Sequence, residues 1–563
     1  MQITNKKKNL IQLVLSILIV LTVYQFLQVF HFRIDLTSEK RFTLSDNTKK
    51  LLSKLEKPVY FEIYLTGDLP HGFNKLKNAT VDLIDEFKSY SNVEIAYSFV
   101  DPSSVLNPKQ KDKNLRELAA RGLEPTSIQE TGRDGSVKQK IIVPGLFVHD
   151  GKKETPVNLL KSVTGLSAEE NLNYAIESVE YELSMAIRML NQTKVKEIAF
   201  FTGQGELGEY EVADFTTSLL QRYEVNRVTA HELSKNYKRF DCVIVAQPRN
   251  EFTERAKYAL DQYIMNGGRV MWLIDEVSAS MDSISAKGMS MAFYKPLNLE
   301  DQLFRYGVRI NPDLLMDVQS QLIPVQATTA GQDGKYIPAP WYYSPLLAPP
   351  NNHPITRKLN MVRVEFANSI DKVGKDPKLK HTVLLASSDN TRLEKVPTPI
   401  RLDIVGKKMN AEDFSDGSKV ISVLIEGQFQ SIFKDRIWKG IDKSTFKSES
   451  AAGKMIVISD GDIIKNRVRG VGSNIQIMPL GYDRYSRKTY GNSNFLLNCV
   501  DYLCDDEGWM NLRSREVKLR LLDKTKIREH RLFYQIVNLA LPIALLILLA
   551  LVWHFVRKRK YAN

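Results

Sequence analysis

The stretch 195–208, VKEIAFFTGQGELG, decides the fold. Its first seven residues predict a strand, the glycines predict a tight turn, and a helix is expected from there to about residue 222. Further strands are predicted at 225–229, 241–246 and 269–274, and a helix at 253–265. Apolar strands that alternate with helices indicate a doubly wound parallel sheet with helices on both faces.

The same sheet is expected to continue late in the chain. Residues 454–459 have the pattern of a buried strand, and residues 494–503 that of a helix. Between them and the earlier strands lies a less regular, β-rich insertion at about 300–450. We therefore expect one flavodoxin/amidotransferase-like α/β domain over residues 193–515.

Residues 31–192 predict a separate α/β domain. The pattern from residue 59 to residue 191 is β-α-β-α-β-β-α, with an Asp150-Gly151 turn between the last two strands. This is the element order of a thioredoxin-like domain. Thr66-Gly67-Asp68-Leu69 follows the first strand in place of Cys-x-x-Cys, so we expect a scaffold and not a redox enzyme.

Two apolar segments flank these domains. Residues 10–30 carry no charge and follow Lys6, Lys7 and Lys8, and residues 533–556 precede a basic tail at 557–560. Each is long enough to cross a bilayer, and the basic residues favour the cytoplasm for both termini. Lys524, Lys526, Arg528 and Arg531 on the other side of the second segment make that signal less clean.

These segments give the organisation 1–30, 31–192, 193–515 and 516–563: a tail with the first transmembrane helix, two extracytoplasmic domains, and a linker with the second helix and a cytoplasmic tail. The net charge is +13 over 563 residues. A membrane explains the terminal basic residues better than nucleic acid does. In a bacterium, this arrangement predicts an inner-membrane protein with a large periplasmic domain.

Three cysteines exclude a disulfide-stapled scaffold and a zinc site built from cysteines. Cys499 and Cys504 are too far apart along one predicted helix to form a disulfide bond unless the helix ends between them. Cys242 lies in a buried-looking strand. We expect three free or inert thiols.

Gly203, Gly205 and Gly208 form a G-x-G-x-x-G motif between a strand and a helix, the context of a dinucleotide site. Glu232, after the next strand, could bind a ribose. Against this, Glu206 and other acids (Glu209, Glu211 and Asp214) crowd the place where a pyrophosphate would need bare backbone amides. The alternative is a tight turn with acidic capping, and we favour it.

No other motif predicts catalysis. The chain contains no G-x-x-x-x-G-K-[ST], so ATP hydrolysis through a P-loop is not expected. No histidine pair has metal-ligand spacing, and no serine or cysteine stands at a nucleophile elbow. Asp460-Gly461-Asp462 after a strand can bind Mg²⁺ or simply form a turn. We predict no catalytic residue, no metal and no cofactor.

Two features are candidate partner sites. Trp341, Tyr342 and Tyr343 lie in a Pro- and aromatic-rich segment read as a loop, which can dock a partner or pack on its own domain. Asn538 lies within the second apolar segment, where it can face a partner helix or sit near the interface.

The chain resembles a known family over nearly its whole length. The matching passages, in order, are the first apolar segment, Arg33-Ile34-Asp35-Leu36-Thr37, Arg41-Phe42-Thr43-Leu44-Ser45, Phe99-Val100-Asp101-Pro102, Thr202-Gly203-Gln204-Gly205-Glu206, Gly267-Gly268-Arg269-Val270 and the closing apolar segment. They resemble the GldG-type auxiliary membrane component of ABC transporters linked to gliding motility in Bacteroidetes. The family's turn usually reads Gly-His-Gly-Glu, and here Gln204 replaces the histidine, so a role of that histidine does not carry over. Gln204 and Glu206 of this turn are candidates for contact with a ligand or partner.

The resemblance implies a complex of an ABC ATPase subunit, a polytopic permease and this protein, with a role in gliding and a substrate-binding-type label. The sequence itself identifies no small-molecule ligand. Besides this accessory role, two hypotheses remain: a structural envelope protein that links motility or secretion machinery, and a periplasmic nucleotide-binding enzyme that uses Gly203 to Gly208.

Overall fold

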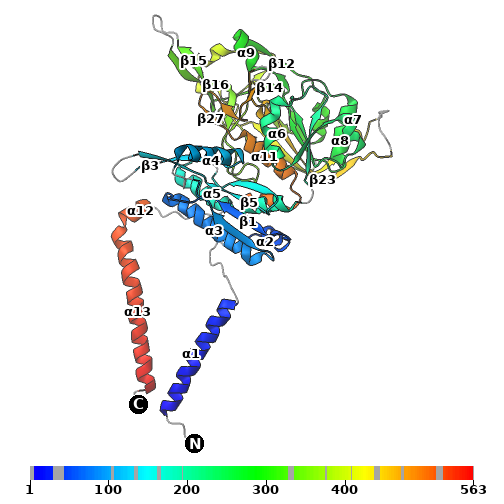
Figure 1. Ribbon diagram of the computed structural model, residues 1–563. Helices are drawn as coiled ribbons and strands as arrows, with labels where there is room; N and C mark the ends of the chain where they lie inside the picture. The colour runs from blue at the N-terminus through cyan, green and yellow to red at the C-terminus, as the bar shows by residue number, and fades with distance from the viewer. Residues whose placement is uncertain are drawn as a thin grey trace. The chain divides into compact units, whose positions relative to one another are not determined.

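The computed structural model describes residues 5–29, 43–102, 107–131, 137–160, 166–192, 195–327, 335–374, 377–406, 409–436, 444–470, 475–514 and 524–561. Residues Phe42–Arg515 form one compact unit, and the two chain ends, Met1–Arg41 and Glu516–Asn563, form another. Figure 1 shows the ribbon of both. The two units are described separately below.

A large sheet forms the centre of the first unit. Its parallel strands have the order β8-β7-β9-β10-β23. They are β7 (Glu197–Thr202), β8 (Glu224–Thr229), β9 (Cys242–Ala246), β10 (Val270–Leu273) and β23 (Glu449–Ile458). Numbered along the chain, this order is 2-1-3-4-5, which is the flavodoxin-like order of doubly wound sheets. The predicted late strand therefore does join the early ones.

The sheet is mixed and not wholly parallel, which corrects the expectation of a parallel sheet alone. Beyond β23 the described strands run antiparallel, in the order β23-β22-β18-β13, and β19 also pairs with β22. Their bounds are β13 (Val308–Ile310), β18 (Ile370–Lys372), β19 (Leu379–Ala386) and β22 (Val420–Gln430). The fold is thus mixed α/β, with both parallel and antiparallel strand pairs.

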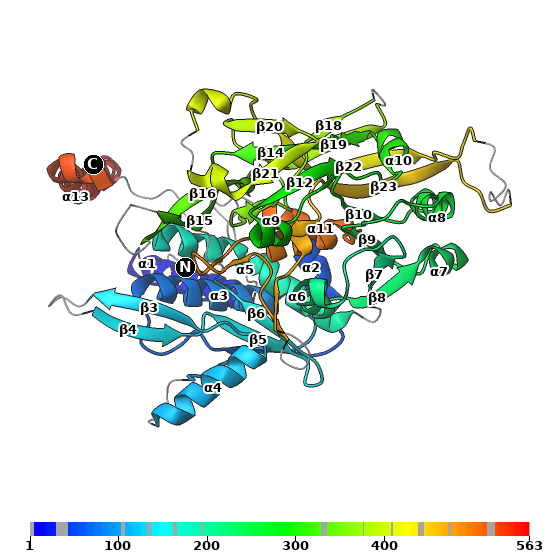
Figure 2. The same ribbon diagram turned by 90° about the horizontal axis from the view of Figure 1, so that it is seen from above.

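Successive residues of a strand point to opposite faces of the sheet, and in the parallel strands both sets are apolar. Helices therefore cover both faces. Ile198 and Phe200 contribute to one core, and Ala199 and Phe201 to the other. The first core lies against α6 (Ala213–Leu220) and α11 (Asn492–Leu503), and the second against α7 (Ala230–Lys235), α8 (Glu254–Met265) and α10 (Glu300–Arg305). Figure 2 shows the sheet and these helices from above.

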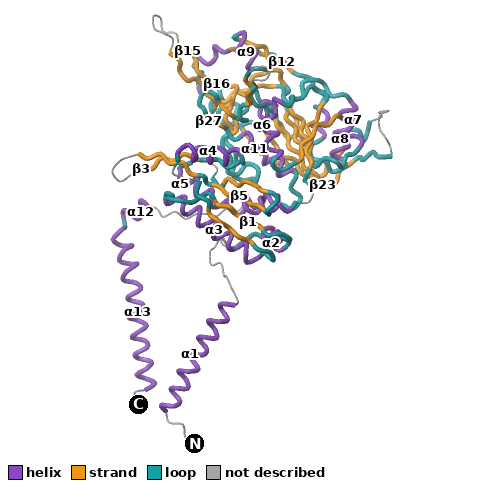
Figure 3. Tube along the Cα trace, viewed as in Figure 1, coloured by secondary structure: helices purple, strands orange, loops and turns teal. Residues whose placement is uncertain are grey.

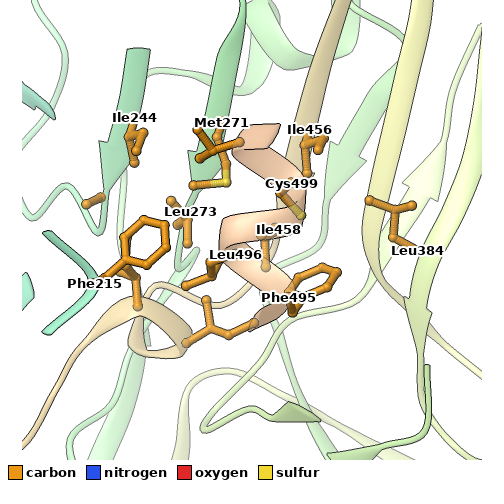
Figure 4. Close-up of a cluster of buried hydrophobic side chains, with 14 of the residues drawn as sticks. Phe215, Ile244, Met271, Leu273, Leu384, Ile456, Ile458, Phe495, Leu496 and Cys499 are labelled. Atoms are coloured by element: carbon orange, nitrogen blue, oxygen red, sulfur yellow. The ribbon is translucent and has the colours of Figure 1, made fainter. Parts of the chain in front are cut away.

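The contact between α11 and the strands is tight and apolar. Phe495, Leu496 and Cys499 of α11 pack among strand residues that include Met271 and Ile456, as Figure 4 shows. All five side chains are fully buried. Burial of apolar surface contributes roughly 25 cal/mol per Å² to stability, so this cluster holds α11 against the sheet.

The region between β10 and β23 is rich in strands, which Figure 3 colours orange, and its strand pairs β12–β21, β14–β20 and β15–β16 are antiparallel. Besides the strands already given, it contains β11 (Val277–Ser278), β12 (Met289–Tyr294), β14 (Asp313–Asp317), β15 (Ser320–Ala327), β16 (Lys335–Leu347), β17 (Val362–Arg363), β20 (Thr391–Lys395), β21 (Thr398–Arg401), α9 (Met281–Lys287) and the 3₁₀ helices η2 (Leu402–Gly406) and η3 (Ala411–Asp413). After β23 come η4 (Asp462–Ile464) and the short strands β24 (Val468–Arg469), β25 (Gln476–Ile477), β26 (Tyr482–Asp483) and β27 (Lys488–Thr489).

The aromatic segment around Trp341 is a strand, and its prediction as a loop was wrong. Residues 335–347 form β16, which pairs with β15 through the prolines at 338 and 340. Trp341 and Tyr343 are 1% and 3% exposed and pack against Phe366. Tyr342 packs against Phe414. These rings form the core of their own region, so they offer little surface to a partner.

The first part of this unit has a four-stranded sheet with the order β2-β1-β5-β6. Its strands are β1 (Val59–Ile63), β2 (Ile95–Phe99), β5 (Gly145–His149) and β6 (Glu154–Asn158), with β1 parallel to β2 and antiparallel to β5. The helices are α2 (Asp46–Ser53), α3 (His71–Tyr90), α4 (Pro108–Ala120) and α5 (Ala168–Asn191).

This element order agrees with the predicted order, with one addition. A hairpin of β3 (Thr126–Thr131) and β4 (Val137–Ile142) precedes β5. The core of the sheet lies between its strands and α2, α3 and α5, whereas α4 contributes to a smaller cluster on Phe147. Ser45 caps α2 and Ser167 caps α5 with a capping box.

Helix α5 joins this part to the end of the compact unit. It contacts η6 (Trp509–Ser514), and the Tyr181 hydroxyl donates to Met510 Sδ at 3.3 Å. Lys358 Nζ donates to Glu177 Oε2 at 2.7 Å and lies 3.7 Å from the centre of the Tyr174 ring. Burial lowers the pKa of Lys358, and Glu177 opposes that shift.

The second unit contains α1 (Asn5–Val29), α12 (Lys524–Glu529) and α13 (Arg531–Tyr561). Among the described residues, one helix, Arg531–Arg559, is long and apolar enough to cross a membrane; α1 has a shorter apolar part, Leu10–Thr22. The first predicted anchor therefore stays a prediction. Residues 33–42, which carry part of the family resemblance, lie outside the described residues.

The three cysteines Cys242, Cys499 and Cys504 are free and buried. Cys504 lies just beyond the last residue of α11 and caps it. Burial raises the pKa of Cys499 well above its ordinary value, which keeps this thiol protonated and unreactive.

The Lys358–Glu177 pair gives a test of the contact made by α5. Lys358→Met leaves the partly buried Glu177 carboxylate without its cation, and we expect a loss of up to about 3 kcal/mol in the free energy of unfolding. Urea denaturation of the compact unit measures it. Glu177→Gln combined with Lys358→Met should recover part of the loss, and an unchanged midpoint in Lys358→Met would contradict this role.

Candidate functional site

The glycine turn after β7 lies where doubly wound sheets bind ligands, at the carboxyl ends of β7 and β9. Gly203 and Gly205 have φ values of +126° and +72°, which favour glycine. A Cβ on Gly205 would lie 2.8 Å from Asn250 Nδ2. Arg249 N and Asn250 N each donate to Gln204 O at 2.9 Å, so the turn is bound to the segment after β9.

The chain's own carboxylate occupies this turn. Gln204 N donates to Glu206 Oε2 at 2.8 Å, and the amides of Gly203 and Glu206 also face the carboxylate. Burial raises the pKa of Glu206, and the three amides oppose that shift. A loop of backbone N–H groups that could hold an anion thus already holds one.

The other groups that a dinucleotide site would use, the amide of Gly208 and the carboxylate of Glu232, also form hydrogen bonds within the chain. Helix α6 begins only at Ala213, after the 3₁₀ helix η1 (Tyr210–Val212), and Gly208 N donates to Glu211 Oε2 at 2.8 Å. Glu232 is the capping-box residue of α7 and accepts from Thr229 N at 2.9 Å. The geometry agrees with the alternative of a tight turn with acidic capping.

A second cluster of polar side chains lies at the carboxyl ends of β9, β10 and β23. Gln247 Nε2 donates to Asp275 Oδ2 at 2.8 Å, and Gly461 N donates to Asp275 Oδ1 at 2.5 Å. Asp460 accepts from Glu365 N at 3.0 Å and from Asp462 N at 2.8 Å. Asp275 and Asp460 therefore hold the loops at this edge together.

Burial and neighbouring acids raise the pKa values of Asp460 and Asp462. Burial raises the pKa of Asp460 well above its ordinary value, and the charges of Asp462 and Asp275 add to the effect. Burial, Asp275 and Glu365 raise the pKa of Asp462 to about 7. Lys295 and Lys465 are the nearby cations, 3.8 Å from Asp275 and 3.7 Å from Asp462.

Several oxygens at this edge lack a hydrogen-bond donor. Within the described ranges, Oε1 of Gln204, Glu206 and Gln247 and Oε2 of Glu276 are buried without a partner. Glu276 follows Asp275 and is 2% exposed. Burial, with the Glu300 charge, raises the pKa of Glu276 to about 8. This carboxyl group is therefore protonated at neutral pH.

The Asp460-Gly461-Asp462 motif forms a turn that enters η4. In the described part of the chain, no group of three or more His, Cys, Asp or Glu side chains could hold a metal ion. Sequence reasoning missed Gln247 and Glu276 as part of this cluster. The signal was the shared position of residues 247, 275 and 460, each of which directly follows or nearly follows a predicted parallel strand.

A large groove in the described part of the compact unit lies away from the carboxyl edge of the sheet. A groove of about 690 Å³ opens between the end of α5 and the start of β8, and its lining includes Gln192, Leu220, Arg222 and Glu224. It is at the amino ends of the parallel strands, the edge opposite to the glycine turn. The carboxyl edge is filled by side chains that satisfy the loop amides.

Asn538 lies in α13, in the other unit, and its side chain is exposed. Its role stays a prediction.

Removing the internal anion should destabilise the glycine turn. Glu206→Ala leaves the amides of Gly203, Gln204 and Glu206 without their acceptor, and we expect a loss of about 1–3 kcal/mol in the free energy of unfolding. Chemical denaturation measures it, and added sulfate should restore part of the loss in the variant alone. Glu209→Ala is the matched control, since Glu209 is 83% exposed; equal losses in both variants would contradict the assignment.

The buried acid Glu276 predicts a pH-dependent stability. A pKa of about 8 in the folded protein, against an ordinary value of 4.5, means that the protonated group favours folding. This contribution is present below about pH 4 and is lost as the pH rises to 8. Since one pKa unit corresponds to about 1.4 kcal/mol, Glu276→Gln should be the more stable protein at pH 9 by a few kcal/mol and nearly equal at pH 4.

Thermal unfolding from pH 4 to pH 9 measures this difference. Glu412→Gln, which removes an exposed acid, serves as the control and should change the melting temperature little at any pH. Parallel pH profiles for the wild type and Glu276→Gln would show that Glu276 is ionised in the folded protein.

Solved structures give no guide to the site. The chain is similar to the mmIFT52 N-terminal domain at 13% identity, covering 55% of this chain and 99% of that one, with a TM-score of 0.30. It also matches the exo-beta-1,4-mannosidase Op5Man5 from Opitutaceae bacterium strain TAV5 at 9% identity, covering 69% of this chain and 46% of that one, with a TM-score of 0.18. Scores this low carry no argument about fold or chemistry.

Sequence comparisons are more informative. An uncharacterized protein of Borreliella burgdorferi is 22% identical over 577 residues, covering 99% of both chains. Residues 38–149 match a domain of unknown function (DUF7088). Residues 195–499, more than half of the chain, match the model ABC_transp_aux, described as an ABC-type uncharacterized transport system. The chain therefore belongs to this family of ABC-type transport system auxiliary proteins.

Proposed function

We propose that this protein is a membrane-anchored, non-catalytic accessory subunit that associates with an ABC ATPase and a polytopic permease in a bacterial inner membrane. Membership of the auxiliary family carries the proposal. The absence of a P-loop motif from the sequence supports it, because the energy of ATP must then come from another subunit. The occupation of the glycine turn by Glu206 supports the non-catalytic part.

The proposed topology has two transmembrane helices, residues 10–30 and α13, with both termini in the cytoplasm. The compact unit would then lie in the periplasm as a thioredoxin-like domain over 31–192 and a flavodoxin/amidotransferase-like domain over 193–515. Supporting observations are the apolar helix Arg531–Arg559 and the basic residues outside both apolar segments.

The finer role that we propose follows from the resemblance to GldG-type proteins of Bacteroidetes: a substrate-binding-type component in gliding motility. Gln204 and Glu206 in the glycine turn remain the candidates for contact with a ligand or partner. Gln204 is 7% exposed and its Oε1 lacks a donor within the described residues, so a partner would have to open this turn to reach it.

Purification from native membranes tests the proposal. We expect the tagged full-length protein, extracted in mild detergent, to bring down an ABC ATPase and a polytopic permease at fixed stoichiometry. Its presence should change the ATPase activity of that complex. Recovery of the protein alone, or with envelope machinery that lacks an ATPase, would instead favour a structural envelope role.

Nucleotide binding is the further control in the same preparation. Because Glu206 fills the amide loop, ATP and NAD should leave the melting temperature of the purified protein unchanged. A concentration-dependent increase that Gly205→Asp abolishes would favour the nucleotide-binding alternative.

A further inference from the structure

The apolar part of α13 carries one strongly polar side chain away from its ends. Residues 532–556 contain no Ser or Thr, Gln535 lies four residues from Arg531, and Trp553 and His554 lie beside the basic tail. Asn538 is six residues from Leu532, which places it about 9 Å along the helix from that residue. Within the apolar part of a membrane span, a hydrogen-bonding protein partner stabilises such an amide.

A proline one turn later adds a second unsatisfied group at the same level. Pro542 lies inside α13, and it has no N–H to donate to the carbonyl of Asn538, four residues earlier. Neighbouring Ser or Thr hydroxyls often satisfy such a carbonyl, but this segment has none. The helix therefore presents a backbone acceptor and a side-chain amide together on one face.

The Ser16 and Thr22 hydroxyl groups of α1 are poor donors for this position. Ser16 Oγ donates to Gln12 O at 2.8 Å, and Thr22 Oγ1 donates to Leu18 O, so both hydroxyl protons are used within their own helix. Gln12 and Gln25 of α1 also carry amide donors, so α1 is one outcome that the test must exclude. Family membership favours an external partner, since an auxiliary protein associates with transport components.

We infer that the Asn538–Pro542 face of α13 docks on a transmembrane helix of the polytopic transporter subunit, which offers a hydroxyl or amide donor at the depth of Asn538. This inference rests on the proposed function and names the residues that form the contact. At 100° per residue, Leu545 lies on the same face as Asn538, and Ile547 lies on the opposite face.

Site-specific photo-crosslinking in the native membrane tests the inference. The full-length protein carries p-benzoylphenylalanine at Leu545 or at Ile547, and mass spectrometry identifies the adduct. We expect an adduct with the polytopic transporter subunit from position 545 and not from position 547. An adduct from 545 with a second copy of this chain, with α1 or with lipid would overturn the assignment, as would equal yields from both positions.

Substitutions then test the hydrogen bonds. Asn538→Leu should lower the yield of the 545 adduct about three- to ten-fold, which is the range for one or two hydrogen bonds between helices. Asn538→Gln should retain most of it. Pro542→Ala, which returns a donor to the Asn538 carbonyl, should lower it as well. Gln535→Leu is the matched control, because it removes an equivalent amide near the helix end and should have little effect.

Co-purification distinguishes the two levels of failure. If the wild-type protein brings down no permease, the proposed function fails. If it does so and Asn538→Leu crosslinks as well as the wild type, the accessory role stands and the assignment of this face is wrong.

Discussion

The parallel pairing of β10 with β23 is the constraint on which the rest of the compact unit depends. Met271 pairs with Ile456 and Trp272 with Val457, and these side chains are fully buried on both faces of the sheet. In the sequence, β10 precedes the antiparallel region and β23 follows it. Their pairing therefore closes a long loop, and the entropic cost of closure grows only slowly with loop length. Apolar burial against α11 and α8 offsets that cost.

This pairing also creates the acidic cluster. Asp275 follows β10 and Asp460 follows β23, so the register that aligns the strands brings both carboxyl groups to one edge. There they accept hydrogen bonds from Gly461 N, Glu365 N and Asp462 N. A cluster with the composition of a metal or catalytic site thus holds neighbouring loops together through hydrogen bonds. The pKa values of Asp460 and Asp462 are raised, and protonation of these groups reduces the repulsion within the cluster.

The sequence predicted the elements whose periodicity is regular, including β7, β9, β10 and β23, and it predicted that the late strand joins the early ones in one sheet; it did not predict the strand order. It misread β16 because prolines at 338, 340 and 345 resemble a loop signal, although a strand tolerates prolines where their missing N–H is not needed. That the acids around Glu206 obstruct a pyrophosphate stays a prediction. That Glu206 itself occupies the amide loop, and that Gln247 and Glu276 lie nearby, depends on distances between loops that spacing along one chain does not contain.

The compact unit and the helix α13 differ in how their polar groups are satisfied. In the compact unit, backbone amides at the carboxyl edge of the sheet donate to the chain's own carboxylates, although the amide oxygens of Gln204 and Gln247 lack a donor within the described residues. In α13, the opposite holds: Asn538 and the carbonyl that Pro542 leaves free have no partner within their own apolar segment. A bilayer penalises such unpaired groups far more than water does, so they need a polar partner within the membrane, which we propose is the transporter subunit. The strongest indication of a partner is therefore in the membrane helix α13. The compact unit, which we propose is periplasmic, instead has a doubly wound sheet whose usual ligand position is occupied by its own side chains.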